Sequence, residues 1–226
     1  MKTIEIQGVT GSVVSHLREE IITAQLSEGA KLNENELSRQ IGVSRPPIRE
    51  SFRKLENENL LVSIPRKGTY ITKLSVEDCQ QVYYARIMIE CSAVDVLKQL
   101  QITELPAVKS ALIAAEKYQL LSSPSAKEML AYLDVMSDFH KQLVEATKNN
   151  WLIHFYTSIN STLSRYQLMY LNLSGAHQFS ISDHTIILNQ ISLGNFEKAK
   201  QHLKTHIERN ANVLIRRMKS KNGYEM

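Results

Sequence analysis

The sequence predicts a mainly α-helical protein in two parts, with β structure confined to one short hairpin. Two patterns in the first part carry this prediction: a pair of helical segments joined by a glycine turn, and two β-rich runs on either side of a basic turn. A third observation is the loss of strand signals after Ser75, where helical periodicity takes over. We therefore expect an N-terminal winged helix-turn-helix with a small β-hairpin wing at residues 1–74, and an all-helical C-terminal bundle at residues 75–226.

The helix pair occupies residues 36–55. Leu37 and Ile41 place apolar groups on one face of a short first helix. Gly42 then supplies the residue that adopts a left-handed turn most readily. A second helix begins at Ser44, so the pattern predicts a helix, a tight turn and a helix. An amphipathic helix over residues 13–26 is expected to pack against this pair.

Two prolines occupy the first turn of the second helix. Pro46 and Pro47 are tolerated there because first-turn amides have no partner inside the helix, and a φ of about −65° suits a helix start. An N-cap side chain normally accepts a hydrogen bond from the backbone N–H of the second or third helical residue. If Ser44 is the N-cap, those two residues are the prolines, which have no N–H. Its hydroxyl is then free to bond another group, such as a phosphate oxygen.

The second helix has one apolar face and one positive face. Ile48 and Phe52 lie on the apolar face, whereas Arg45, Arg49 and Arg53 recur at every fourth residue on another face. A solvated basic surface is the common interpretation of such a charge run. Here the arginines sit on the second helix of a glycine-turned pair, from which side chains reach a DNA major groove.

The β-rich runs at 60–64 and 69–72 predict a hairpin with Arg66, Lys67 and Gly68 at its tip. Glycine at this point permits close approach to a nucleic-acid backbone or groove. An ordinary solvated turn remains the alternative.

Residues 37–50 resemble the helix-turn-helix signature of GntR-type bacterial transcription regulators. The resemblance implies a partner of double-stranded DNA. Pro46 stands where the family commonly has Thr, Ser51 where Ala is common, and Glu28 where a Pro usually precedes the glycine. The change at Pro46 bears on which operator is read. The expected DNA-binding residues are Asn35, Ser44, Arg45, Pro46, Arg49, Arg53, Arg66, Lys67 and Gly68.

Composition permits a soluble globular protein. The 226 residues are 43% hydrophobic, and the net charge of +4 mildly favours an anionic partner. No run approaches the eighteen or so apolar residues of a membrane span, and the start lacks the apolar stretch of a signal peptide, so we expect no membrane association and a cytoplasmic location. Cys79 and Cys91 fall on one expected helix, about 18 Å apart, too far for a disulfide.

Helical periodicity and capping signals divide the second part into six expected helices. Ser75 followed by acidic residues is typical of a helix start, and Gly194 separates the last two. The expected ranges are 75–99, 103–123, 124–147, 149–173, 181–193 and 195–219.

Three histidines lie on three different expected helices of the second part. Their surroundings resemble the helical ligand-binding (FCD) domain of the FadR branch of the GntR family, over roughly residues 75–219. In many members of that branch, one Asp and three His bind a divalent cation at the floor of a ligand pocket. The resemblance implies metal ligands His140, His184 and His206. The expected effector contacts are Arg86 and Asn149, which lie in segments that carry the resemblance, and His202.

The aspartate of that pattern is missing. The family places it one helical turn before the first histidine, where this chain has Met136. Asp138 is two residues from His140 and points to another side of the helix. His202 is a candidate replacement because it lies one turn before His206.

Three neutral imidazoles suit Zn²⁺ or Ni²⁺ better than Mg²⁺ or Ca²⁺, which prefer oxygen ligands. Arg86 can clamp an effector carboxylate by bidentate hydrogen bonds, or it can merely pair with Glu90 at i+4. The expected function is that of a homodimeric, ligand-responsive transcriptional regulator of the repressor type. It binds a palindromic operator and is modulated by a small carboxylate.

Two other protein classes are weighed against this interpretation. A three-histidine metalloenzyme with an accessory basic domain needs a general base near the metal, and no acidic residue accompanies the histidines in an arrangement such as His-Glu-x-x-His. A helical protein-interaction module leaves the arginine-bearing helix unexplained. We therefore expect no enzymatic activity.

Overall fold

The computed structural model describes residues 4–118, 126–171 and 176–221. The chain divides into two compact units, one of Met1–Leu74 with Ser158–Arg165, and one of Ser75–Thr157 with Tyr166–Met226. Within the described ranges, no helix has the length and apolar character needed to cross a membrane. The mainly helical fold class with one small antiparallel sheet is confirmed.

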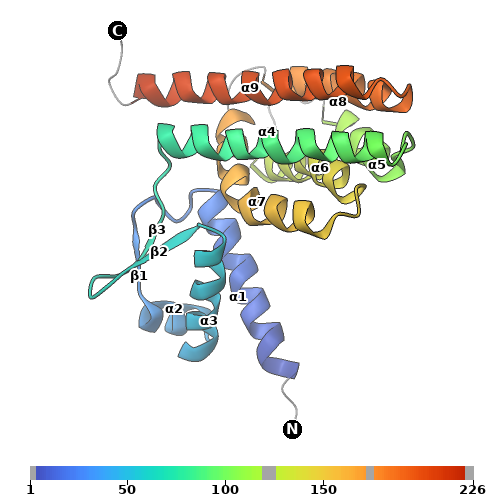
Figure 1. Ribbon diagram of the computed structural model, residues 1–226. Coiled ribbons are helices and arrows are strands. Elements are labelled where there is room, and N and C mark those ends of the chain that lie inside the picture. Colours follow the sequence, from blue (N-terminus) through green and yellow to red (C-terminus); the bar gives the residue numbers. More distant parts are fainter. Residues whose placement is uncertain (1–3, 119–125, 172–175, 222–226) are drawn as a thin grey trace. The chain divides into compact units, whose positions relative to one another are not determined.

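The first unit combines helices with a small sheet (Figure 1). Helix α1 begins well before the predicted residue 13 and leaves the helical conformation at Ala24, whose φ is +58°. Helix α1 packs across α3, and α2 also contacts α3. The elements are α1 (Ile4–Ile22), β1 (Lys31–Leu32), α2 (Glu34–Ile41), α3 (Arg45–Asn57), β2 (Leu61–Ile64) and β3 (Gly68–Ile71).

The sheet has the strand order β1-β3-β2, and both pairings are antiparallel. The predicted hairpin is confirmed as β2 and β3, with Ile64 opposite Gly68. Strand β1 was not predicted, because two residues are too few to show the alternation that identifies a strand. Its pairing of Leu32 with Thr69 joins the segment before α2 to the wing.

The turn between α2 and α3 forms as its residues require. Asn33 caps α2 by accepting hydrogen bonds from the backbone N–H groups of Asn35 and Glu36. Gly42 ends α2 in the left-handed region, with a φ of +73°, and donates its N–H to the Ser38 carbonyl. The core beneath these helices is apolar and includes Leu17, Ile48, Phe52, Leu55, Leu60 and Ile71.

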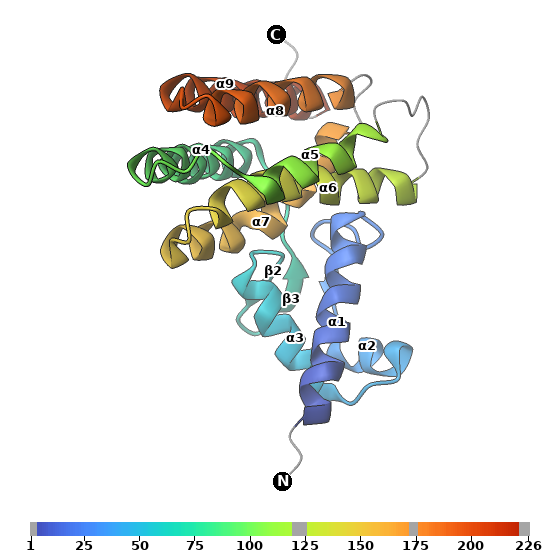
Figure 2. The same ribbon diagram turned by 90° about the vertical axis from the view of Figure 1, so that its right-hand side faces the viewer.

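The regular secondary structure of the second unit, within its described residues, is α-helical. Helix α4 runs alongside α9 (Figure 1), and α5 lies beside α6 (Figure 2). Helix α5 ends earlier than the predicted residue 123, and residues 119–123 of that prediction lie outside the described residues. The elements are α4 (Val76–Gln99), α5 (Pro106–Glu116), α6 (Ala126–Glu145), α7 (Asn150–Leu171), α8 (Ala176–Ser192) and α9 (Phe196–Lys221).

Helix α4 contributes one buried face to the core of this unit. Its N-cap Ser75 accepts a hydrogen bond from the Asp78 backbone N–H at 3.0 Å, as the acidic start predicts. Tyr83 and Leu97 are buried along its length. Cys79 and Cys91 are both free thiols, and burial raises the pKa of Cys91 to about 11, so it is protonated and unreactive at neutral pH.

A carboxylate links α1 to the end of α3 in the first unit. The Arg18 guanidinium donates to Glu58, with Nε–Oε2 and Nη2–Oε1 distances of 2.8 and 2.5 Å, and the Ser161 hydroxyl donates to Oε2 at 2.7 Å. Burial raises the pKa of Glu58, but the hydrogen bonds from Arg18 and Ser161 lower it more, so the net shift is downward. Such a carboxylate stabilises the fold above its unfolded-state pKa, and this contribution is lost as the pH falls through its folded-state pKa.

We predict that Glu58→Gln lowers the free energy of unfolding at pH 7 by about 1–2 kcal/mol, because it removes the charged acceptor of the Arg18 bonds. The difference from wild type should shrink below about pH 4, where the wild-type carboxyl becomes protonated. Thermal unfolding at pH 7 and pH 3 measures both values. Glu50→Gln, at an exposed position of α3, is the matched control. If Glu58→Gln destabilised the protein equally at pH 7 and pH 3, the effect would come from altered packing and not from the lost charge.

Candidate functional site

Helix α3 has the two faces that its periodicity predicts. Ile48 and Phe52 are buried in the core of the first unit. Arg45, Arg49 and Arg53 are exposed on the other side of the helix. The exposed row presents guanidinium groups, which bind phosphates and guanine edges by forked hydrogen bonds.

Ser44 is the N-cap of α3, with extended backbone angles, and its side chain makes no capping hydrogen bond. Pro46 is exposed beside it, while Pro47 is buried. The exposed Ser44 hydroxyl is therefore available to a ligand, because the prolines of the first turn have no N–H for it to accept from.

Arg49 is held by an acidic residue of the neighbouring helix. Its Nε and Nη2 atoms donate to Glu34 of α2 at 3.2 and 2.9 Å. The hydrogen bond to Glu34 raises the pKa of Arg49, and the same bond lowers the pKa of Glu34. Sequence reasoning missed this pair, because the two residues are fifteen positions apart and no helical spacing relates them. The pair orients the planar guanidinium on an exposed surface.

The wing tip is a tight turn between β2 and β3. Its Lys67 N–H donates to the Ile64 carbonyl at 3.0 Å, and Arg66 has a φ of +63°. Gly68 has a φ of +115°, a backbone conformation that favours glycine. Arg66, Lys67 and Gly68 are all exposed, and so is Asn35 at the start of α2.

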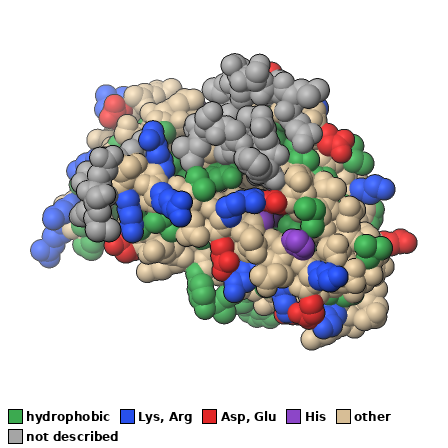
Figure 3. Space-filling model, turned by 90° about the horizontal axis from the view of Figure 1, so that it is seen from above, with side chains coloured by type: hydrophobic (Ala, Val, Ile, Leu, Met, Phe, Trp, Pro, Cys, Tyr) green, Lys and Arg blue, Asp and Glu red, His purple; other side chains and the backbone are tan. Residues whose placement is uncertain are grey.

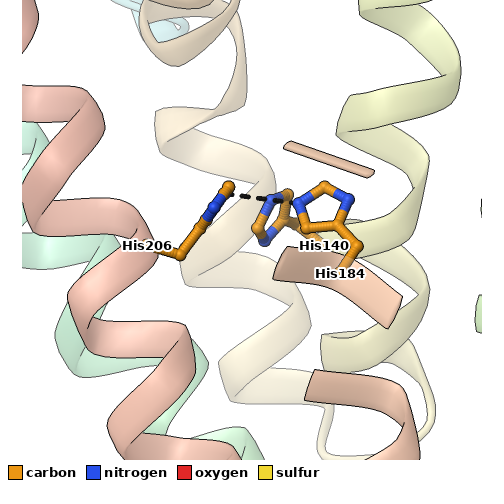
Figure 4. Close-up of side chains that lie close together, drawn as sticks. All are labelled: His140, His184 and His206. Atoms are coloured by element: carbon orange, nitrogen blue, oxygen red, sulfur yellow. Dashed lines mark hydrogen bonds between the residues drawn. The ribbon is translucent and has the colours of Figure 1, made fainter. Parts of the chain in front are cut away.

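In the second unit, three buried histidines converge. His140 comes from α6, His184 from α8 and His206 from α9 (Figure 4), and one ring nitrogen from each lies within 4.8 Å of the other two. The Nε2 atoms of His184 and His206 are 3.3 Å apart. The ring of His184 also stacks on Phe139, with ring centroids 3.9 Å apart, which fixes its plane.

Two carboxylates set the tautomers of these rings. Nδ1 of His140 is 2.6 Å from Oε2 of Glu90, and Nδ1 of His206 is 2.8 Å from Oδ2 of Asp183. A carboxylate accepts, so each Nδ1 carries the hydrogen and each Nε2 keeps its lone pair. Burial lowers the pKa of all three histidines, and well below the usual value for His140 and His184. The rings are therefore in the neutral form that binds metals.

The donor set suits a divalent cation in its chemistry, and its three ligand atoms, which lie within 4.8 Å of one another, would draw closer around an ion. Two ligand atoms about 2.0–2.1 Å from one ion lie about 2.8–3.0 Å apart at adjacent octahedral positions and about 3.3–3.4 Å apart in tetrahedral geometry. The separation of 3.3 Å between His184 Nε2 and His206 Nε2 matches the tetrahedral value. Nδ1 of His184 is buried and has no hydrogen-bond partner among the described residues, so no acceptor or donor fixes the tautomer of that ring through Nδ1.

The histidines line a cavity of about 30 Å³. Met136, one turn before His140, is buried in its wall at the position where the family places an aspartate. Asp138 lines a different groove, together with Asp134 and residues of α5, as its spacing predicts.

Arg86 also reaches this cavity. It is only 1% exposed, and its Nε donates to Oε1 of Glu90 at 2.6 Å. Burial lowers the pKa of Arg86, but the charge and hydrogen bond of Glu90, together with the nearby Tyr156 and Tyr83, raise it more, so the guanidinium stays charged. Nη2 of Arg86 is buried and has no hydrogen-bond partner in the part of the chain that is described. The pairing with Glu90 therefore leaves one donor edge unused.

The structure does not bring the other predicted effector contacts to this cavity. His202 is exposed, and Asn149 is an exposed cap of α7 whose Oδ1 accepts from the backbone N–H groups of Trp151 and Leu152. Neither residue lines the cavity. Sequence reasoning missed Asp183 and Asn210. Two signals could have found them: Asp183 is the neighbour of His184 in the sequence, and Asn210 follows His206 by one helical turn.

Comparison with known proteins identifies both units. Residues 10–71 match the family of bacterial regulatory proteins, gntR family, and residues 81–209 match the FCD domain. The uncharacterized HTH-type transcriptional regulator YdhC of Bacillus subtilis (strain 168) is 30% identical over 195 residues, which are 85% of this chain and 84% of that protein. The HTH-type transcriptional repressor RspR of Escherichia coli (strain K12) is 22% identical over 202 residues, 89% of this chain and 87% of that protein.

Solved structures show the same fold. A GntR transcriptional regulator from Rhodococcus sp. RHA1 superposes with a TM-score of 0.73 at 24% identity, covering 91% of this chain and 97% of that one. The family resemblance and the absence of enzymatic function predicted from the sequence are confirmed by these matches. The chain belongs to the GntR family of bacterial regulatory proteins and is a transcriptional regulator with an N-terminal helix-turn-helix domain and a C-terminal FCD domain.

Proposed function

We propose that this chain is a dimeric repressor that binds a palindromic DNA operator and responds to a small carboxylate held at a divalent cation. The observation that carries the ligand half of this proposal is the buried group of His140, His184 and His206 beside the unused edge of Arg86. Ligand occupancy in the second unit would shift the relative placement of two DNA-binding heads. One relative, RspR, is named a repressor, which supports this direction of control.

The exposed row on α3 supports operator binding. Arg45, Arg49 and Arg53 occupy the helix that enters the major groove in this domain type, and the Ser44 hydroxyl suits a phosphate. The face formed by α8 and α9 differs, because Lys and Arg side chains there are interspersed with Asp and Glu (Figure 3).

The cavity supports binding of a cation and an anion together. Three neutral imidazoles favour Zn²⁺ or Ni²⁺. With Met136 in place of a carboxylate, the three histidines leave the full charge of a divalent ion uncompensated, and a bound ion would act as a Lewis acid toward an effector oxygen. Arg86 would bind a second oxygen through Nη2. A cavity of about 30 Å³ favours a small carboxylate over a bulky effector.

The two carboxylates next to the histidines are poorly placed to act as the general base that a metalloenzyme needs. Glu90 is shared between Arg86 and His140, and Asp183 accepts from His206 and Arg209. Both nearby carboxylates therefore orient other side chains.

We predict that Arg49→Ala weakens operator binding by about tenfold to a hundredfold, because a guanidinium that reads a base edge loses both hydrogen bonds. Arg66→Ala and Lys67→Ala should instead weaken binding to all DNA and reduce the slope of log affinity against log salt by about 0.9 for each phosphate that the variant no longer neutralises. Fluorescence anisotropy with operator and random duplexes, over a salt series, separates these effects.

Arg216→Ala, at an exposed position of α9, removes the same charge outside the first unit and is the matched control. Normal operator affinity of Arg49→Ala at matched salt would contradict the assignment of α3 as the recognition helix.

We predict that the full chain is a dimer at micromolar concentration, with a mass twice its 25.8 kDa, because one helix-turn-helix buries too little DNA surface for tight specific binding and a two-fold pair matches a palindrome. Light scattering coupled to size-exclusion chromatography measures the mass. A monomer at this concentration would rule out the dimeric mode of operator recognition.

We predict that His184→Ala loses most of its bound Zn²⁺ or Ni²⁺, because the variant removes one of three converging ligands. Metal content is measured by mass spectrometry after purification without chelators or a polyhistidine tag. His202→Ala, which removes an exposed histidine of α9, should keep wild-type metal content. Near-zero metal in wild type and His184→Ala alike would remove the metal from the mechanism.

A further inference from the structure

We propose that Asn210 supplies the oxygen ligand whose usual position is occupied by Met136, so that the cation site is three imidazoles and one amide. This inference rests on the metal site of the proposed function. Asn210 lies on α9 one helical turn after His206, is 7% exposed, and lines the same cavity as the three histidines. Residues at i and i+4 on a helix share a face, so both side chains enter the cavity from one direction.

Only one of the two polar atoms of the Asn210 amide has a hydrogen-bond partner among the described residues. Its Nδ2 lies 3.3 Å from Nε2 of His206, whereas its Oδ1 is buried without a hydrogen-bond partner among the residues that the structure describes. A buried amide oxygen without a partner is costly, and such atoms in native proteins usually meet an ion or a water. A half-turn about the last side-chain bond exchanges the nitrogen and oxygen positions. The exchange places Oδ1 next to His206 Nε2.

The spacing then suits a shared ion. The amide position lies 3.3 Å from His206 Nε2, and His184 Nε2 lies at the same distance from that atom. Both values match the separation of about 3.3–3.4 Å expected for two atoms that bind one cation in tetrahedral geometry. Without a cation, Nδ2 of Asn210 is the better neighbour, because it donates to the lone pair of His206. With a cation, the oxygen is the better neighbour.

Other atoms of the cavity wall are less suited to this place. Met136 offers a thioether, a weak and soft donor that suits Cu(I) better than a Zn²⁺ or Ni²⁺ site of imidazoles. Oε1 of Gln167 already accepts a hydrogen bond from the Ser137 hydroxyl at 3.0 Å. An amide ligand also has a chemical consequence. It is neutral, so it leaves the ion with its full positive charge and with a stronger attraction for an anionic effector than a carboxylate ligand would allow.

Cobalt(II) is the probe for this assignment, because its visible absorption bands report the identity and number of its ligands. Wild type, Asn210→Ala and Asn210→Asp are titrated with Co²⁺ against a competing chelator, and the spectra of the loaded proteins are recorded. Asn212→Asp is the matched control, since it adds the same charge at an exposed position of α9.

We expect Asn210→Ala to bind Co²⁺ about tenfold or more weakly and to change the visible bands, because one ligand is removed. Asn210→Asp should bind Co²⁺ about tenfold more tightly, since a carboxylate replaces a neutral oxygen. Asn212→Asp should behave as wild type. A residue that only orients His206 would give the opposite sign for Asn210→Asp, because the carboxylate cannot donate to Nε2.

Weaker Co²⁺ binding by Asn210→Asp, or a wild-type spectrum and affinity for Asn210→Ala, would overturn the assignment of Asn210 and leave a three-histidine site. Failure of the wild-type protein to bind Co²⁺, with the same result for His184→Ala, would instead overturn the metal site itself. The two failures are therefore distinguishable.

Discussion

The buried carboxylate of Glu90 is the contact on which the ligand-binding unit depends. It lies on α4 between the guanidinium of Arg86 and the ring of His140 on α6, and it accepts a short hydrogen bond from each. Without it, Arg86 would be an uncompensated charge in the interior, which is among the most destabilising arrangements in proteins. Burial raises the pKa of Glu90 and Arg86 opposes that rise, so the carboxylate is tied to its partners electrostatically as well as sterically. The Glu90 side chain thus balances the charge of Arg86 and orients the ring of His140, including the ring nitrogen that would bind a metal.

Much of the fold could be predicted from the sequence because its signals are local. Helical periodicity separates the buried Ile48 from the exposed Arg49, and Gly42 marks a turn that needs a left-handed residue. Strand β1 and the pair of Arg49 with Glu34 could not be predicted this way. Both are contacts between segments that no fixed spacing relates, so only the folded chain brings them together.

The candidate site shows the same division. The three histidines were found through resemblance, and the structure brings them together, but their carboxylate partners come from distant positions. His202 was selected because it lies one turn before His206. The inward stripe of α9 instead follows Leu203, Ile207 and Leu214, and His202 falls at its exposed edge. A turn of 100° per residue leaves residues four apart about 40° out of line, and the rotation from His206 to His202 is opposite to that from His206 to Asn210. One rotation leads to solvent and the other to the cavity wall.

The pair of Glu34 and Arg49 has a consequence for discrimination between DNA sequences. An arginine that already holds a carboxylate gains little from exchanging it for a phosphate, since the two anions offer similar forked acceptors. A guanine edge offers a neutral acceptor pair that need not displace the acid completely. The acidic neighbour also repels the DNA backbone when the helix is in the wrong register. If Arg49 reads a base as proposed, Glu34 would act as an internal competitor that reduces background binding to arbitrary DNA and favours the register in which Arg49 faces a base.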